Sequence, residues 1–334
     1  MTANRRRRDS GATGFVFIDK PSGCTSHDVV ARARRALGTR KVGHAGTLDP
    51  LATGVLLLGV GRATKLLGMI SGGDKEYLAD IRLGVSTHTD DQQGEVTLRM
   101  SAGHLSEEQV RAGMSRFVGR IAQRPSAVSA IKVDGRRAHE RVRRGENVEL
   151  PERPVTVAHF DLVSLSPPGE ESGMGYRDIN VRVVCGSGTY VRALARDLGE
   201  MLGVGGHVRA LRRTRLGPID VAECTPLQAF EAAPEVIPLA ASARRWFSTV
   251  PVSPVMAVDL SHGRAVDATT LDSSEPPVAR PPEPPTRLLA IGPAGEVVAL
   301  TEVRDGMLAP VIVFVSPADA HDLQGAGDGE AGAT

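Results

Sequence analysis

A glycine-rich segment near the N-terminus, residues 43–54, presents a single carboxylate, Asp49, ahead of an apolar run. Pro50 disfavours the helical conformation for the residue before it, so we expect Asp49 to lie in extended backbone at the tip of a loop. The glycines of the segment allow tight turns and a close approach to a bulky ligand. A carboxylate in such a loop can attack an electron-poor carbon or stabilise positive charge on it. An isolated Asp-Pro pair is more often only the start of a turn, so other residues must decide between the two readings.

Tyr77 and Arg192 have residue types that suit a site around this carboxylate. Tyr77 opens an alternating run, 77–83, that is typical of a strand, with the tyrosine on the apolar side. Its ring can stack on a planar ligand and its hydroxyl can take part in proton transfer, and ordinary strand packing is the alternative. Arg192 falls in the first turn of a predicted helix, where the helix dipole disfavours a cation, so we expect a carboxylate beside it.

The elements that position these residues alternate between strands and helices. We predict strands over 14–18, 77–83 and 179–185, a helix that starts with Ser26 as its N-cap and ends at Gly38, and a helix over 191–202. The interleaving predicts an α+β fold, with a mixed, largely antiparallel sheet flanked by helices.

The character of the chain changes after about residue 220. Segments 251–258, 288–291, 297–303 and 311–315 are predicted strands, joined by turns at 293–295 and 305–306, which favours a small C-terminal β-barrel. We therefore expect a catalytic domain over 14–247 and a C-terminal domain over 248–319 that carries a proline-rich, extended insertion at 272–286. By composition the tails 1–13, which includes Arg5 to Arg8, and 320–334 are expected to be disordered.

Charge and composition restrict the class of protein. The net charge is +1, but residues 221–334 hold 6 Arg, no Lys and 15 acidic residues, a net of −9, so residues 1–220 carry +10. A basic first portion suits a polyphosphate partner, although scattered arginines are commonly solvated helix faces. Three widely spaced cysteines argue against a disulfide framework or a structural zinc, and favour a reducing cytoplasm. No apolar run reaches the ~20 residues of a membrane helix, and no signal peptide is recognisable.

The loop around Asp49 resembles the catalytic loop of the bacterial TruB family, the tRNA pseudouridine-55 synthases, in which the aspartate of a Gly-Thr-Leu-Asp-Pro segment is catalytic. Further blocks in the same order carry the resemblance, which covers residues 14 to 220. The matching blocks are 19–26, 43–54, 74–77, 187–199 and 206–214.

The resemblance implies the pseudouridine synthase fold, a PUA-like C-terminal domain, and a reaction on the T-arm of tRNA that needs no cofactor and no metal. It implies catalytic roles for Asp49, Tyr77 and Arg192, with Arg192 as the partner of Asp49. His44 would stack in the space left by the flipped base. The remaining residues expected to bind substrate or RNA phosphates are Tyr190, Leu211, Lys20, Lys132, Arg209, Arg212 and Arg213. A cytoplasmic monomer without an obligate protein partner is expected.

The sequence departs from the family where Val128 replaces a usual aromatic and His139 a usual tyrosine, both in a thumb-like insertion that grips RNA. Because of these changes the sequence does not define the RNA contacts of the insertion, whereas the expected catalytic residues are all present. Two rival functions remain. A carboxylate-based glycosylase would need a bound water and usually a cluster of acids, whereas the acids next in sequence to Asp49 are Asp74 and Glu76. A tRNA-folding chaperone would bind without chemistry.

Overall fold

The computed structural model describes residues 11–126, 150–268, 287–316 and 319. It also gives the backbone of two short paired strands, β8 (Lys132–Val133) and β9 (Arg136–Arg137). Several of our expectations therefore lie outside the described residues: the tail with Arg5 to Arg8, the insertion at 272–286, the tail after 319, and the thumb positions 128 and 139.

A twelve-stranded mixed sheet forms the body of the protein, with the strand order β15-β1-β3-β13-β4-β12-β10-β7 and four strands paired off this path. Its pairs are antiparallel except for β1 with β15 and β3 with β13, so the expected mixed, largely antiparallel sheet is confirmed. The strands are β1 (Gly14–Lys20), β2 (Val42–Ala45), β3 (Thr53–Val60), β4 (Lys75–Leu83), β7 (Gly119–Gln123), β10 (Arg153–Leu165), β11 (Gly169–Glu171), β12 (Met174–Cys185), β13 (Gly206–Leu216), β14 (Ile219–Asp220), β15 (Thr225–Pro226) and β16 (Ile237–Pro238).

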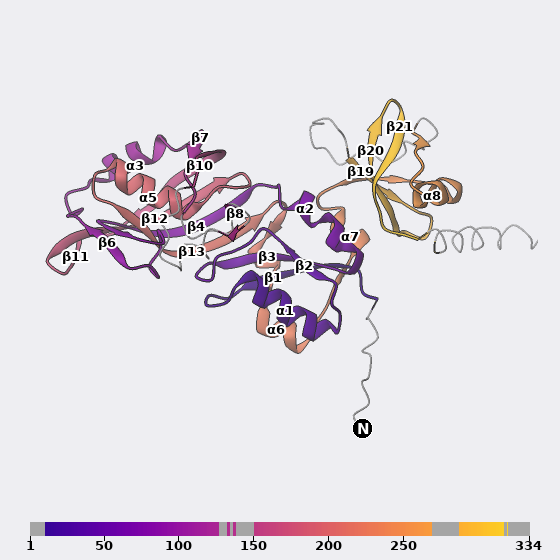
Figure 1. Cartoon of the computed structure of the whole chain (residues 1–334), viewed down its shortest axis with the longest axis horizontal. Coiled ribbons are helices and arrows are strands. Elements are labelled where there is room, and N and C mark those ends of the chain that lie inside the picture. The colour runs from indigo at the N-terminus through magenta and orange to yellow at the C-terminus, as the bar shows by residue number, and fades with distance from the viewer. Residues whose placement is uncertain are drawn as a thin grey trace, which may run out of the picture.

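Short helices flank this sheet, as Figure 1 shows, with α1 and α6 under the β1–β3 part and α3 and α5 over the β4–β10 part. A separate hairpin of β5 (Val85–Thr87) and β6 (Val96–Arg99) follows β4. The helices are α1 (Ser26–Leu37), η1 (Gly61–Leu66), α2 (Leu67–Ile70), α3 (Glu107–Ser115), α5 (Val191–Met201), η2 (Val221–Glu223), α6 (Leu227–Ala232) and α7 (Leu239–Ala243).

Helix α1 begins one residue earlier than the sequence predicts. Thr25, rather than Ser26, is the N-cap, because its hydroxyl accepts from the Asp28 backbone N–H at 3.0 Å while the Asp28 carboxylate accepts from the Thr25 N–H at 2.8 Å. Ser26 is instead buried and its hydroxyl bonds to the loop that carries Asp49. The predicted end is correct: Gly38 is the C-cap in the left-handed conformation, with φ 67°.

Strand β4 and helix α5 have the predicted buried faces. Alternate residues of β4 from Tyr77 to Leu83 are buried, and the apolar stripe of α5 packs on them in the main core cluster. Since Tyr77 begins the buried row and Arg192 begins the helix, the two pack at the same end of this layer, where both line one pocket.

A five-stranded sheet of order β17-β19-β20-β21-β18 forms the C-terminal region and is consistent with a PUA-like domain. Its elements are β17 (Ser248–Pro251), α8 (Pro254–Ser261), β18 (Val266–Asp267), β19 (Arg287–Ile291), β20 (Val297–Arg304) and β21 (Met307–Val313). The predicted strand at 251–258 is wrong. Ser253 caps a helix there and accepts from the Met256 N–H at 3.3 Å, and Pro254 occupies the first turn, where proline is tolerated.

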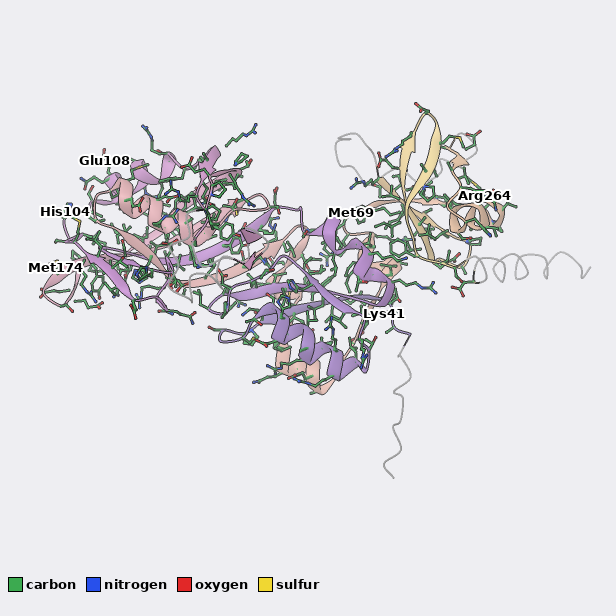
Figure 2. The ribbon with its side chains drawn as sticks, in the orientation of Figure 1. Lys41, Met69, His104, Glu108, Met174 and Arg264 are labelled. Carbon is green, nitrogen blue, oxygen red and sulfur yellow. The ribbon has the colours of Figure 1, made fainter. Side chains whose placement is uncertain are left out.

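The C-terminal sheet is packed against the main body near α2 and α7 (Figure 1). One apolar cluster joins Phe15 and Leu57 of the main sheet with Leu289 and Leu300 of the C-terminal sheet and with Phe314, which follows β21. Figure 2 shows Arg264 on the far side of the C-terminal sheet and Met174 at the opposite end of the molecule. In the part of the chain that the structure describes, no helix has the length and apolar character to span a bilayer.

Candidate active site

The loop that carries Asp49 connects β2 to β3 and depends on two glycines in the left-handed region. Gly46 and Gly54 have φ values of 70° and 97°. A Cβ on Gly54 would lie 2.1 Å from the backbone oxygen of Arg213, so no other residue fits there without a shift of the neighbouring strand β13. The Asp49 carbonyl accepts from the Ala52 N–H at 3.1 Å, which closes the loop tip.

The segment 20–26 is hydrogen-bonded to this loop. The Ser26 hydroxyl bonds to the carbonyl and the N–H of Leu48, the Gly23 N–H donates to the Pro50 carbonyl at 2.9 Å, and the Ser22 hydroxyl donates to the Leu51 carbonyl. The two sequence blocks that matched the TruB family separately, 19–26 and 43–54, are thus one structural unit.

Lys20 and Arg213, which we expected to contact phosphates, are both buried in the structure. Both side chains are 0% exposed. Lys20 donates to the Pro21 carbonyl at 2.9 Å, while Arg213 donates to the carbonyls of Gly46 and Val55 at 2.8 and 2.7 Å. Lys20 also donates to the Pro50 carbonyl at 3.4 Å, so both residues anchor the Asp49 loop, and Arg213 lines the pocket beside it.

Arg192 holds the carboxylate of Asp49, as the helix dipole argument predicts. Its Nε donates to Asp49 Oδ2 at 2.9 Å, and its Nη1 donates to the Thr89 carbonyl at 2.7 Å. The Arg192 side chain is 3% exposed, whereas that of Asp49 is 36% exposed. The buried guanidinium therefore fixes a carboxylate that still faces solvent and any bound ligand.

Asp91 is a site residue that the sequence analysis missed. Its Oδ2 lies 3.5 Å from Arg192 Nη1, and its Oδ1 accepts from the Thr89 hydroxyl and the Gln93 N–H. The preceding Asp90 has a φ of 58°, in the left-handed region, and burial raises the pKa of its carboxyl while Arg196 opposes that shift. The signal available in the sequence was two adjacent acids in a polar turn between strands.

A pocket of about 360 Å³ lies beside Asp49, within the range of about 300–1,000 Å³ that is usual for small-ligand sites. Tyr77 and Leu211 line it from the neighbouring strands β4 and β13, in which Tyr77 pairs with Arg213 and Leu211 with Ala79. Burial raises the pKa of the Tyr77 hydroxyl, and the adjacent guanidinium of Arg213 opposes this shift. An aromatic and an aliphatic wall near a carboxylate suit a flat, partly apolar ring.

Tyr190 lines the pocket from the position before α5, where a second missed residue fixes its backbone. The amide of Gln123 accepts from the Tyr190 N–H at 2.9 Å and donates to the Tyr190 carbonyl at 3.1 Å. Gln123 is 1% exposed and ends β7. This paired contact sets where helix α5, and hence Arg192, begins.

His44 lies in β2, five residues before Asp49, and does not line the pocket. Its ring packs edge-on against His27 at 5.3 Å, and its buried Nδ1 has no hydrogen-bond partner among the described residues. Burial lowers the pKa of His44 to about 4, and the charges of His27 and Arg213 add to the shift. The neutral imidazole is therefore available for stacking, which stays a prediction.

Arg209 and Arg212 are the exposed members of the arginine cluster. Each side chain is 41% exposed, and they pair with Asp178 at 2.6 Å and with Asp19 at 2.7 Å. Lys132 belongs to β8, and its side chain lies outside the described residues. In the C-terminal region, nearby acids pair with Arg264, Arg287 and Arg304, which we call the C-terminal arginines.

The arrangement places one carboxylate, held by a buried arginine, at the mouth of a pocket with room for a base. Among the described residues, no group of three or more His, Cys, Asp or Glu gathers as a metal cluster. A carboxylate so held can attack or stabilise an electron-poor sugar carbon while the pocket holds the detached base. Asp91 also pairs with Arg192, but its Oδ2 contacts the guanidinium and Asp91 does not line the pocket. The lining of this pocket therefore lacks the two facing carboxylates of a typical glycosylase.

Solved structures with the same fold come from H/ACA ribonucleoproteins. One, described as the structure of an H/ACA RNP bound to a substrate RNA containing 2′-deoxyuridine, matches with a TM-score of 0.65 and 24% identity over 92% of this chain and 86% of that chain. A second, the archaeal box H/ACA sRNP Nop10-Cbf5 complex, matches with the same TM-score and 23% identity over 92% of this chain and 88% of that chain.

Family models cover both halves of the site. The model of the TruB family pseudouridylate synthase N-terminal domain matches residues 34–191, and that of the tRNA pseudouridylate synthase B C-terminal domain matches residues 192–238. Fold and site together define a pseudouridine synthase, which is an isomerase.

Relatives named tRNA pseudouridine synthase B extend the match to almost the whole chain. The proteins of Arthrobacter sp. (strain FB24) and Leifsonia xyli subsp. xyli are each 48% identical, over 90% and 92% of this chain and 96% and 97% of their own. That of Thermobifida fusca is 48% identical over 91% of this chain and 99% of its own. The chain belongs to the TruB family.

Proposed function

We propose that the protein isomerises uridine to pseudouridine at position 55 in the T-loop of tRNA, without a cofactor. The observation that carries the proposal is the Asp49–Arg192 pair at 2.9 Å beside a pocket walled by Tyr77 and Leu211. The relatives named tRNA pseudouridine synthase B, 48% identical over nearly their full length, supply the tRNA substrate.

The reaction breaks the N1–C1′ bond of uridine, turns the detached uracil, and joins C5 to C1′. The target base first leaves its stack, at a cost of a few kcal/mol, and enters the pocket between Tyr77 and Leu211. Asp49 then acts on C1′, either by forming a covalent bond or by stabilising its positive charge. Arg192 keeps Asp49 aimed at the sugar. The hydroxyl of Tyr77, which lines the same pocket, is the group that we assign to removal of the C5 proton.

RNA contacts in this proposal come from the basic first portion of the chain. Arg209 and Arg212 are half-exposed and can exchange their carboxylate partners for phosphates, with release of counterions. His44 would take the space left by the flipped base, and Lys132 would contact the T-arm from β8. The protein would work as a cytoplasmic monomer.

The direct test is incubation of the purified protein with an unmodified tRNA transcript, followed by mapping of pseudouridine. We expect one new pseudouridine, at position 55, and none with the Asp49→Asn variant. A folding chaperone that only binds tRNA would give no modified nucleotide with either protein. A free abasic site would instead indicate a glycosylase.

A further inference from the structure

Two cations that the mechanism above does not use lie side by side at one end of the pocket. The position that a Cβ on Gly46 would occupy is 3.1 Å from Arg213 Nη1 and 3.6 Å from Lys75 Cε, so both side chains pack beneath the same glycine. Lys75 is 7% exposed and Arg213 is 0% exposed, and both line the pocket. We call this pair the cationic end.

Neither cation has its hydrogen-bonding capacity filled. The ammonium of Lys75 has three N–H groups, and two of them donate at 3.0 Å to the carbonyls of Ser71 and Gly73. Arg213 Nη1 is buried and has no hydrogen bond of good geometry among the described residues, although the Arg213 side chain lies near the Tyr77 hydroxyl. In the described ranges neither side chain forms an ion pair. Burial lowers the pKa of Lys75, and the charge of Arg213 lowers it further, which shows the cost of this arrangement.

The charge of the whole pocket points to a negative ligand. Its lining residues include one carboxylate, Asp49, and three cations, Lys75, Arg192 and Arg213, a net charge of +2. Asp49 is already bonded to Arg192, so it does not compensate the cationic end. A buried cation without an anion lowers the stability of the free protein. A negatively charged ligand in the pocket would supply the missing anion.

We propose that the cationic end stabilises the negative charge that uracil carries after it leaves the sugar. The inference rests on the proposed function. When the N1–C1′ bond breaks, its electron pair leaves with the base, and C1′ becomes electron-poor and is neutralised by Asp49. The charge of the anion spreads over N1 and the two carbonyl oxygens. C5 then bonds to C1′ with the π electrons of the base, C5 loses its proton and N1 gains one.

Lys75 is the group of the cationic end that contacts the base. Its third N–H is free to donate to a uracil carbonyl oxygen, where negative charge develops as the bond breaks. Arg213 lies behind it, tied to Gly46 and Val55, and adds its charge from a fixed position. Because both cations are in place before the base arrives, no reorganisation is needed when the charge appears.

The test compares Lys75→Met and Lys75→Arg in single-turnover reactions with saturating tRNA. Loss of one such donor lowers a rate constant by about 100-fold to 1,000-fold, and we expect a fall of this size for Lys75→Met and partial recovery for Lys75→Arg. Lys41→Met is the matched control, because Lys41 is exposed, lies at the junction with the C-terminal sheet (Figure 2) and does not line the pocket. Thermal unfolding and tRNA binding confirm that each variant is folded.

A second substrate separates this role from a structural one. In tRNA that carries 5-fluorouridine at the target position, fluorine stabilises the uracil anion, so the base needs less help to leave. The measured event is loss of the N1–C1′ linkage in a nuclease digest. We expect the defect of Lys75→Met to be at least about tenfold smaller with this substrate than with uridine.

The outcomes are distinguishable. Equal defects of Lys75→Met on both substrates, or a normal rate on uridine, would overturn the role of the cationic end while the wild-type activity still supports the proposed function. A wild-type protein that forms no pseudouridine in tRNA would overturn the proposed function and this inference with it.

Discussion

The substitution Arg192→Met removes one guanidinium from a site where it meets several oxygen acceptors, including those of Asp49, Thr89 and Asp91. Methionine retains an apolar stem of similar bulk but donates no hydrogen bond. The acceptors left behind are Asp49 Oδ2, the Thr89 carbonyl and Asp91 Oδ2, at 2.9, 2.7 and 3.5 Å from the guanidinium nitrogens. The loss in the free energy of unfolding depends on how well water can hydrate each acceptor.

Asp49 and Asp91 differ strongly in this respect. The Asp49 side chain is 36% exposed and regains water, whereas that of Asp91 is 6% exposed. Breaking a fully buried pair costs about 3–5 kcal/mol. Asp91 keeps its bonds from the Thr89 hydroxyl and the Gln93 N–H at 2.6 and 3.0 Å, which reduces the loss. We expect the free energy of unfolding to fall by about 2–3 kcal/mol.

For a unit of this size each kcal/mol lowers the unfolding midpoint by about 2–4 °C, so the midpoint should fall by roughly 4–12 °C. The assay is thermal and urea unfolding of the free protein. In the Arg192→Met background, Asp91→Asn removes the stranded charge and should restore about half of the loss. Arg111→Met serves as the control, because its pair with Glu107 is exposed and contributes at most about 0.5 kcal/mol. Unchanged stability of Arg192→Met, or no recovery in the double variant, would refute the reasoning.

Four other predictions concern chemistry, pH and RNA binding. Asp49→Asn should abolish turnover and keep tRNA affinity within about tenfold, since it removes no phosphate contact; measurable single-turnover activity would contradict the assignment of Asp49. Tyr77→Phe should retain stacking and form product much more slowly, and a near-normal rate would leave Tyr77 a packing residue. The pKa of His44 is lowered from 6.5 to about 4, so the unfolded state binds a proton first and the protein loses stability as the pH falls from 6.5 to 4. His44→Gln should therefore flatten the acid side of the curve of stability against pH, with a substitution of the exposed His159 as the control. A curve identical to that of the wild type would refute the lowered pKa. Replacing the three C-terminal arginines by glutamine should leave the slope of log affinity against log salt nearly unchanged, because all three pair with acids of their own region, and a large drop in slope would show that they contact the RNA backbone.

Local sequence signals predicted the elements that carry the site. The alternation in β4 placed Tyr77 on the buried face, and the position of Arg192 in the first turn of α5 predicted its carboxylate partner. Both inferences depend on short-range periodicity and on backbone dipoles, which the sequence displays directly.

Burial of single charged residues was not predictable in the same way. Lys20 and Arg213 were expected to bind phosphates, because a lysine or arginine side chain is normally exposed. Their burial depends on the packing of β1 and β13 beneath one loop, at separations of 30 to 167 residues from the carbonyls they bind. Asp91 was missed for a related reason, since its partner is about a hundred positions away. The strand predicted at 251–258 failed because the helix-starting pair Ser253–Pro254 was given less weight than the apolar run.

The anchoring of the Asp49 loop by Arg213 has a consequence for protein synthesis. The loop ends, at Gly46 and Val55, are held by a residue made 158 or more positions later. At about 5–20 residues per second, a nascent chain spends roughly 8–30 s with Asp49 translated and its anchor still absent. An N-terminal fragment that ends before β13 lacks this anchor of the Asp49 loop, even when it contains Asp49 and Tyr77. We therefore expect activity only from chains whose translation has passed β13.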